Sequence, residues 1–392
     1  MLNTPFSPWP SYTDEEVDAV AATLRSNRVN QWTGEHVRRF ETEFALWCGT
    51  EHAVAVANGT LALDLALKAL DIGVGDEVIV TPRTFMASVS SVVTAGATPV
   101  FADVDPDSGN ITASTVAPCI NSKTKAIVPV HLAGWPVDIG AIRTMTGDKD
   151  IAIIEDCAQA HGARVRNKPV GGLGDIGAWS FCQDKIMTTG GEGGMVTCSD
   201  LEYWERMWSY KDHGKSWDAV FNRTHAPGFR WVHESIGTNW RMLEMQAVLG
   251  RIQLKRMAEW TQRRTTIAHR IHAALQPFLS AIRAPLPSED YVHAFYRFYA
   301  YVRPSRLRSG WDRDRIVAEF GALGVPLFQG SCSEVYLEKA FDNTALRPTQ
   351  PLPVARELGE TSLMFLTHPT LTDEEIEKTC AVINQVMSDA CG

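Results

Sequence analysis

The chain has 392 residues, of which 45% are hydrophobic and 21% charged, and its formal net charge is −9 at pH 7. This composition predicts a globular protein with a large core, and the negative charge argues against a nucleic-acid partner or an anionic membrane surface. The eight cysteines show neither a CxxC pattern nor a cysteine–histidine ligand spacing, so we expect no zinc or other metal site and no disulfide framework.

The first residues, MLNTPFSPWP, lack the basic segment and apolar stretch of a secretory signal. The most apolar region, residues 53–70, is interrupted by Asn58, Gly59, Asp64 and Lys68, and is too polar to span a membrane. We therefore expect a cytoplasmic protein without a membrane partner.

The N-terminal half alternates strand and helix patterns. Thr13–Glu16 has the spacing of a capping box and is followed by apolar residues at helical intervals. The expected strands are 53–57, 75–82, 97–104, 125–132, 151–158, 174–181 and 193–199, and the expected helices between them include 61–70 and 84–95. Seven strands, several of them apolar throughout, predict an α/β fold with a mostly parallel sheet covered on both faces.

The pattern changes after about residue 240. A long amphipathic helix is expected at 242–275, a strand at 296–302, a helix at 311–323 and a final helix opened by a second capping box, Thr372–Glu375. This mixture predicts a smaller C-terminal α+β domain. We expect an N-terminal arm and helix at 1–27, a large α/β domain at 28–255 and the small domain at 256–392.

Ligands of such sheets bind beyond the carboxyl ends of the strands. Four groups of residues fall at these ends: Asn58–Thr60, Thr84–Phe85, Asp156–Gln159 and Ser180. Lys185 follows in SFCQDKIMTTGGEGG, where it precedes the glycines, so it is not the lysine of a P-loop. A lysine in an apolar setting can lose its proton and attack a carbonyl, which is the role of a Schiff-base lysine.

A Schiff-base cofactor such as pyridoxal 5′-phosphate (PLP) needs a carboxylate for the ring nitrogen, phosphate donors, a stacking side chain and a partner for the ring hydroxyl. Asp156 ends an apolar strand, where a carboxylate is costly without a partner. Gly59 and Thr60 would open a helix, whose free N–H groups favour an anion. The other candidates are Ser180 for the phosphate, Phe85 for stacking and Gln159 for the ring oxygen.

Each of these residues taken singly also fits a structural role. Lys185 fits a surface lysine, Asp156 the N-cap of a following helix, and Phe85 a core residue. Asn58–Thr60 fits a turn and helix cap. Their joint order along one α/β chain favours the cofactor site.

The chain resembles the DegT/DnrJ/EryC1/StrS sugar aminotransferases, PLP enzymes of fold type I. The resemblance runs from about Pro8 to the last helix and includes VANGTLALDLALKAL, GDEVIVTPRTFMAS, EDCAQAHGA, SFCQDKIMTTGGEGGMV and GTNWRMLEMQAVLGRIQL. It implies that Lys185 bonds to the cofactor and shuttles protons, and that Asp156 pairs with the pyridinium nitrogen. Gln159 is similar to the residue at the ring hydroxyl and Phe85 to the stacking residue, while Gly59, Thr60 and Ser180 look like phosphate ligands.

Asn239 resembles an asparagine that reaches the phosphate from a second subunit, which implies a homodimer with shared active sites. Asp184 departs from the family pattern, in which a small residue such as threonine or alanine usually precedes the lysine. The segment between Gly214 and Asn239 is long, basic and aromatic. It fits either a packed surface loop or a loop that faces substrate or crosses between subunits.

The resemblance implies a two-stage transamination with pyridoxamine 5′-phosphate (PMP) as intermediate. L-glutamate is the expected donor, and the acceptor is a keto- or aldehydo-sugar, expected to be nucleotide-linked, for lipopolysaccharide, glycan or antibiotic sugars. The alternatives are a free acidic sugar such as an oxidised 3-deoxy-octulosonate, which would give an 8-amino sugar, a sugar dehydratase, or an inactive regulatory relative. The dehydratases carry histidine at the lysine position, so Lys185 argues against them, and the intact set of site residues argues against an inactive relative.

Overall fold

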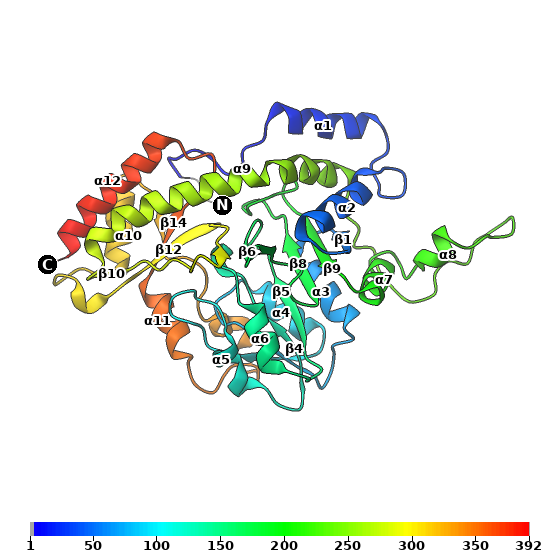
Figure 1. Ribbon diagram of the computed structural model, residues 1–392, viewed down its shortest axis with the longest axis horizontal. Helices are drawn as coiled ribbons and strands as arrows, with labels where there is room; N and C mark the ends of the chain where they lie inside the picture. The colour runs from blue at the N-terminus through cyan, green and yellow to red at the C-terminus, as the bar shows by residue number, and fades with distance from the viewer. Residues whose placement is uncertain (1–3, 392) are drawn as a thin grey trace.

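The expected α/β fold is confirmed by the computed structural model, which describes residues 4–391 and contains a seven-stranded sheet (Figure 1). The strands are β1 (His52–Val56), β2 (Glu77–Val80), β3 (Thr98–Phe101), β4 (Thr124–Val128), β5 (Ala152–Asp156), β8 (Ile176–Ser180) and β9 (Gly194–Cys198). Their order is β1-β9-β8-β5-β4-β2-β3, and only β9 runs antiparallel to its neighbours. The sheet is therefore mostly parallel, as predicted.

Each strand of this sheet lies in a predicted segment or within one residue of it, and most are shorter than predicted. The predicted runs included apolar loop residues beyond the strand ends, which continue the hydrophobic pattern without pairing. The helix expected at 84–95 is α4 (Ala87–Thr94), because Thr84–Met86 form the loop that leads into it. This difference places Phe85 on a loop at the edge of the sheet instead of on a helix.

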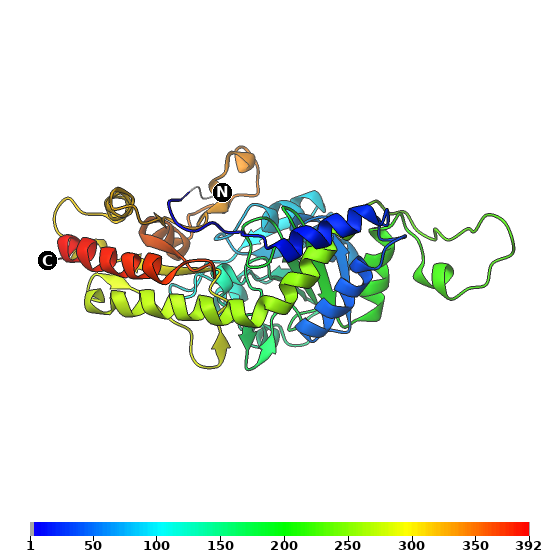
Figure 2. The same cartoon turned by 90° about the horizontal axis from the view of Figure 1, so that it is seen from above.

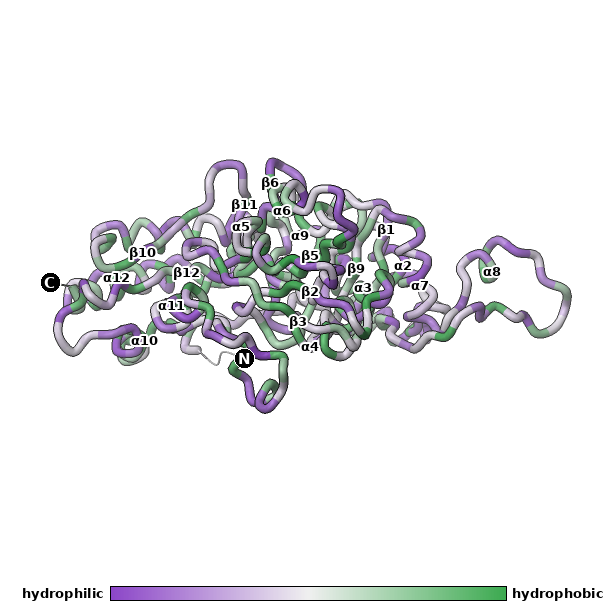
Figure 3. Tube along the Cα trace, turned by 90° about the horizontal axis from the view of Figure 1, so that it is seen from below, coloured by the Kyte–Doolittle hydropathy of each residue, from purple (hydrophilic) through white to green (hydrophobic). Residues whose placement is uncertain are grey.

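Helices cover both faces of the large sheet. In β1, Val54 and Val56 pack into the cluster that contains α3 (Gly59–Ala69), α4 and α7 (Leu201–Tyr210), while Ala53 and Ala55 pack with α2 (His36–Cys48). Alternate residues of a strand point to opposite faces, so one strand supplies both layers. The apolar segments gather at the centre of the molecule in Figure 3.

A second, antiparallel sheet has its own core and the order β10-β12-β14-β13. Its strands are β10 (Ile282–Arg283), β12 (Arg297–Val302), β13 (Leu327–Phe328) and β14 (Ser362–Leu366), packed with α10 (Arg313–Ala322) and α12 (Asp373–Ala390). The 32-residue α9 (Glu244–Leu275) runs along both parts and packs on α1 (Asp14–Arg25), α2 and α12 (Figure 1). Because α9 continues unbroken through residue 255, the expected boundary there, like that at residue 27, stays a prediction, and residues 1–3 and 392 of the outer segments lie outside the described residues.

The remaining α-helices and strands are short. They are α5 (Ala113–Val116), α6 (Ile139–Thr146), α8 (Trp217–Phe221), α11 (Pro353–Thr361) and a three-stranded sheet of β11 (Tyr291–Val292), β6 (Arg164–Val165) and β7 (Lys168–Pro169). Both capping boxes are confirmed: the Glu16 carboxylate accepts the Thr13 N–H at 2.8 Å, and the Glu375 carboxylate accepts that of Thr372 at 2.9 Å. None of the helices in residues 4–391 has the length and apolar character needed to cross a membrane.

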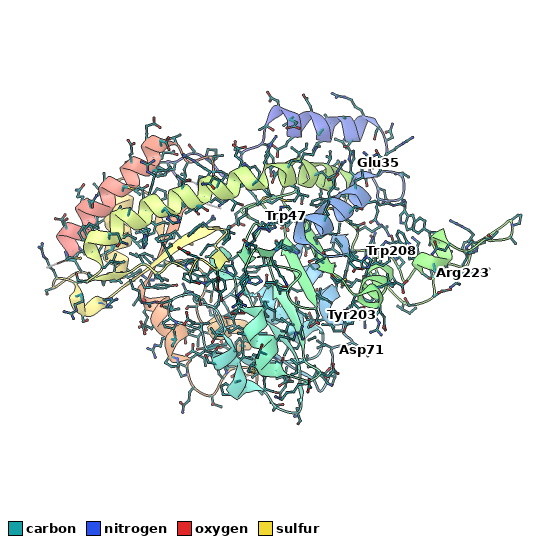
Figure 4. All side chains as sticks on the ribbon, in the orientation of Figure 1. Glu35, Trp47, Asp71, Tyr203, Trp208 and Arg223 are labelled. Carbon is teal, nitrogen blue, oxygen red and sulfur yellow. The ribbon has the colours of Figure 1, made fainter. Side chains whose placement is uncertain are left out.

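An arm formed by residues 213–238 projects from the body of the molecule beyond α7 (Figure 2). Its helix α8 is fixed to α7 by aromatic contacts, since the Trp217 ring lies 5.0 Å from that of Trp208. Figure 4 shows Trp208 at the base of the arm and Arg223 farther out. Arg223 bridges the two limbs of the arm through its contact with Glu234 at 2.5 Å. The interpretation as a packed surface loop therefore applies to α8 and not to the tip.

Candidate active site

A cavity of about 550 Å³ lies beyond the carboxyl ends of β5 and β8, beside the start of α3. Seven of the eight predicted site residues line it: Gly59, Thr60, Phe85, Asp156, Gln159, Ser180 and Lys185. They meet because parallel strands present their carboxyl ends at one edge of a sheet. Asn239 is exposed at the base of the arm and is not among the residues that line this cavity.

Gly59 and Ser180 form one corner of the cavity, at the N-terminus of α3. The N-cap side chain of Asn58 accepts the Leu61 N–H at 3.0 Å, which leaves the N–H groups of Gly59 and Thr60 at the open end of the helix. The Ser180 hydroxyl lies directly beside this end, since a β-carbon at position 59 would stand 2.8 Å from its oxygen. These donors, together with the positive end of the helix dipole, are suited to a phosphate.

Asp156 ends β5 at the floor of the cavity and is 5% exposed. Its Oδ2 accepts the Ser88 hydroxyl at 2.7 Å and its Oδ1 accepts the Ala158 N–H at 3.1 Å. Burial raises the pKa of Asp156, and the neutral donors Ser88 and Ala158 oppose that shift only in part. The N-cap interpretation of Asp156 is wrong, because a turn and not a helix follows it.

Gln159 and Phe85 occupy opposite extremes of exposure. The Gln159 Oε1 accepts the Ala133 N–H at 2.7 Å, so the side chain is only 7% exposed and its NH₂ group is left as the donor. Phe85 is 71% exposed at the cavity wall, so the interpretation as a core residue is wrong. An apolar ring at that exposure is available to stack on a ligand.

Lys185 is half-buried on the loop after β8, so it is not an ordinary surface lysine. Its backbone carbonyl accepts the Trp9 Nε1–H at 2.8 Å, which ties the N-terminal arm to this loop. Burial lowers the pKa of Lys185, but its electrostatic interactions with Tyr296, Asp184 and other ionisable groups outweigh burial and raise the pKa above its ordinary value. The surroundings of Lys185 are therefore not purely apolar, because Tyr296 and Asp184 both lie close to its amine.

A second cavity of about 360 Å³ extends from Lys185 toward the small sheet and shares Phe85, Gln159 and Asp184 with the first. Tyr296 and Arg297, at the start of β12, line its wall. The Tyr296 hydroxyl donates to the Asp184 carboxylate, and the Lys185 ammonium lies 5.2 Å from the centre of the Tyr296 ring. A ligand bound at Lys185 therefore has space on the side of the small sheet.

The described residues fit PLP. Asp156 is a buried carboxylate with neutral hydrogen-bond partners, which is suited to a protonated ring nitrogen. A free helix N-terminus and a hydroxyl stand at one end of the same cavity and an amine at another. Gln159, with its NH₂ group as donor, and the exposed ring of Phe85 complete the set.

Three contributors had no signal in the sequence. Ser88 lies in the first turn of α4 and orients Asp156, while Trp9 and Tyr296 come from segments far from Lys185 in the chain. Asp184 did stand out as a departure from the family pattern. Its partners Tyr296 and Arg297 did not stand out, because only the packing of the small sheet brings them close to Asp184.

Comparisons with known proteins agree with this geometry. The model of the DegT/DnrJ/EryC1/StrS aminotransferase family matches residues 10–384. The chain is 34% identical over 383 residues to the GDP-perosamine synthase of Caulobacter vibrioides, covering 96% of this chain and 97% of that protein. The X-ray structure of an aminotransferase from Psychrobacter cryohalolentis is 60% identical, with a TM-score of 0.97 over 98% of this chain and 99% of that one.

A putative sugar aminotransferase of Streptococcus pneumoniae, solved in its PMP form, is 27% identical, with a TM-score of 0.86 over 98% of this chain and 99% of that one. The chain therefore belongs to the DegT/DnrJ/EryC1/StrS aminotransferase family. The predictions of fold type, of PLP as cofactor and of a sugar aminotransferase are confirmed at this level.

Proposed function

We propose that this member of the DegT/DnrJ/EryC1/StrS family transfers the amino group of L-glutamate to a nucleotide-linked keto- or aldehydo-sugar. The observation that carries the proposal is the shared cavity of Lys185, Asp156 and the open N-terminus of α3. The similarity to a GDP-perosamine synthase supports a nucleotide-linked acceptor. The second cavity gives such an acceptor room beyond Lys185.

The roles of the residues follow from their positions. PLP supplies an electron sink that stabilises negative charge at the carbon next to the amine. Lys185 would anchor this group through its amine, and its Nζ would accept and return protons at the reacting carbon. Asp156 would hold a proton on the ring nitrogen, Gln159 would donate to the ring oxygen and Phe85 would cover one face of the ring.

The proposed assembly is a homodimer in which Asn239 of each chain completes the phosphate site of the other. Two observations support it. Asn239 lies outside the cavity of its own chain, and the arm exposes apolar side chains: Phe229 is 75%, Trp231 84% and Ile236 92% exposed. Exposed apolar groups of this size are typical of a surface that a second chain covers.

The visible spectrum of the PLP-loaded protein tests the function. We expect a yellow band that L-glutamate bleaches and that a suitable keto-sugar restores. Lys185→Ala should lose the band and the turnover, whereas Lys168→Ala, at an exposed site on β7, should keep both. A band that is indifferent to L-glutamate, or full turnover by Lys185→Ala, would contradict the proposal.

Arg297 favours a second candidate acceptor, a free acidic sugar such as an oxidised 3-deoxy-octulosonate. Its buried guanidinium lines the cavity on the side where the acceptor would enter. A panel of nucleotide-linked keto-sugars and acidic keto-sugars, offered to the glutamate-treated enzyme, distinguishes the two by which class restores the yellow band.

A further inference from the structure

Arg297 is a buried cation that faces a cavity without a carboxylate bonded to it. The residue is 5% exposed and lines the second cavity together with Lys185. Its Nη1 donates to the Tyr296 carbonyl at 2.8 Å, and its guanidinium lies 4.1 Å from the centre of the Tyr296 ring. A guanidinium held in this way presents a planar set of donors that matches a carboxylate.

The only ion pair of Arg297 among residues 4–391 is a loose one with Asp184. The Arg297 Nη2 and the Asp184 Oδ2 are 3.8 Å apart, beyond the length of a good hydrogen bond. Asp184 also accepts the Tyr296 hydroxyl and lines both cavities. Its side chain is 44% exposed, whereas that of Arg297 is 6% exposed. Asp184 is therefore the partner that can turn away into solvent while Arg297 stays in place.

A buried charge is costly unless it is paired. An enzyme that admits an amino acid and then a different acceptor at one site must keep Arg297 neutralised at each stage. Asp184 can serve as the counter-charge when the bound molecule brings none. A substrate carboxylate bound beside Lys185 would replace Asp184 as the partner of Arg297. It could form the close hydrogen bonds with the guanidinium that Asp184, at 3.8 Å, does not form.

We propose that Arg297 is the receptor for a substrate carboxylate and that Asp184 is the exchangeable counter-charge that this carboxylate displaces. The proposal rests on the proposed function, since the carboxylate is that of the amino donor or of an acidic acceptor. It assigns substrate selection to a pair of residues that have no proposed role in holding the cofactor. It also gives a purpose to the acidic residue that precedes Lys185.

Glutarate, a dicarboxylate that cannot react, is the probe. Its dissociation constant for the PLP-loaded protein can be measured by isothermal titration calorimetry without any turnover. Arg297→Gln should weaken binding about 10- to 100-fold, because it removes a charge-assisted hydrogen bond in a desolvated site. Arg297→Lys should restore part of the affinity for glutarate, since the positive charge remains but the planar pair of guanidinium donors is lost. Arg283→Gln is the matched control: Arg283 also stacks on a tyrosine and pairs with Asp107, but it lines neither cavity.

Asp184→Asn separates displacement from a general charge effect. If the carboxylate displaces Asp184, this substitution should increase the affinity for glutarate in the wild-type background. In the Arg297→Gln background it should leave the affinity for glutarate unchanged. Tightening of equal size in both backgrounds would overturn the exchange, and wild-type affinity in Arg297→Gln would overturn the receptor. Melting temperatures within a few degrees of wild type show that each variant is folded.

The source of the carboxylate is read from the donor half-reaction. Stopped-flow bleaching by L-glutamate should need a higher glutamate concentration in Arg297→Gln if the donor supplies the carboxylate, with bleaching by L-alaninamide unchanged. If bleaching is unaffected but the glutamate-treated form has lost glutarate affinity, the carboxylate belongs to the acceptor. A wild-type protein that glutamate does not bleach would sink the proposed function, while the glutarate titrations would still decide the role of Arg297.

Discussion

Gly59 and Ser180 approach so closely that a β-carbon at position 59 would lie 2.5 Å from the β-carbon of Ser180. The contact joins the start of α3 to the end of β8, and it brings helix N–H groups and a hydroxyl to one point. Glycine is needed at position 59 for its size alone, because its backbone angles are not in the left-handed region.

Gly59→Ala should therefore push α3 away from β8 and weaken the phosphate corner. We expect a destabilisation of about 1–3 kcal/mol from the overlap, and a loss of PLP affinity beyond that. Equilibrium unfolding and PLP titration measure the two effects. Gly73→Ala is the control, since a β-carbon there would have an ordinary contact of 3.6 Å. Equal PLP affinity in Gly59→Ala and wild type would show that this corner does not bind the phosphate.

Trp9 should position the loop of Lys185 from a distance. Trp9→Phe removes the N–H that the Lys185 carbonyl accepts but keeps a ring to pack at the edge of Trp260, 5.1 Å away. We expect a loss of about 1 kcal/mol of stability and faster amide exchange in residues 182–189. Hydrogen–deuterium exchange by mass spectrometry measures this, with Trp231→Phe, an exposed residue of the arm, as control. Unchanged exchange in the loop would show that the hydrogen bond does not hold it.

His161 should make the protein sensitive to acid. Its ring is fully buried, 5.1 Å from that of Trp179, and neither ring nitrogen has a hydrogen-bond partner among the described residues. Burial first, then the charges of Lys185 and Arg264, lower the pKa of His161 from 6.5 to about 3. The unfolded chain therefore takes up a proton below pH 6.5 that the folded chain refuses, so stability falls as the pH drops from 6.5 toward 3.

His161→Leu should abolish the part of the pH dependence of stability that comes from protonation of His161 in the unfolded chain. Between pH 7 and 5 the variant should lose about 2 kcal/mol less stability than wild type, as measured by urea unfolding at both pH values. The exposed His233→Asn controls for a change of histidine content. His293 and His368, whose pKa values burial also lowers to about 3, keep part of the acid sensitivity in every variant. If His161→Leu loses as much stability between pH 7 and 5 as wild type, the acid sensitivity comes from His293 and His368 instead.

Hybrid dimers test the shared site. Neither Lys185→Ala nor Asn239→Ala homodimers should contain an intact site. A mixed dimer should contain one, because the site with the intact Lys185 receives the intact Asn239 of the other chain. Random mixing should thus restore roughly a quarter of the wild-type sites, counted by the glutamate-sensitive band. If each chain uses its own Asn239, mixing restores none beyond the homodimers.

The local signals in the sequence determined much of the fold. Hydrophobic periodicity identified all seven strands of the large sheet and the helix now labelled α9, and two capping boxes marked helix starts that the structure keeps. The same signals missed the three-stranded sheet, the partner strands of β12 in the small sheet, and the helices α2, α5, α6, α7, α8 and α11. These strands are short, and an apolar run of a few residues such as 362–366 does not distinguish a strand from a buried helical turn.

The site divides in the same way. Gly59, Asp156, Gln159 and Ser180 could be placed at the edge of the sheet from the sequence, because the carboxyl ends of parallel strands meet there whatever the strand order. The partners of Asp184 could not, since Tyr296 lies 112 residues away and reaches it only when the small sheet packs against the large one. Sequence patterns report the neighbours of a residue along the chain and the face it turns to the core. Which distant side chains meet in a cavity is decided by how whole elements pack. The sequence therefore shows that Arg297 is a cation, but only the tertiary structure shows that it lines the same cavity as Lys185.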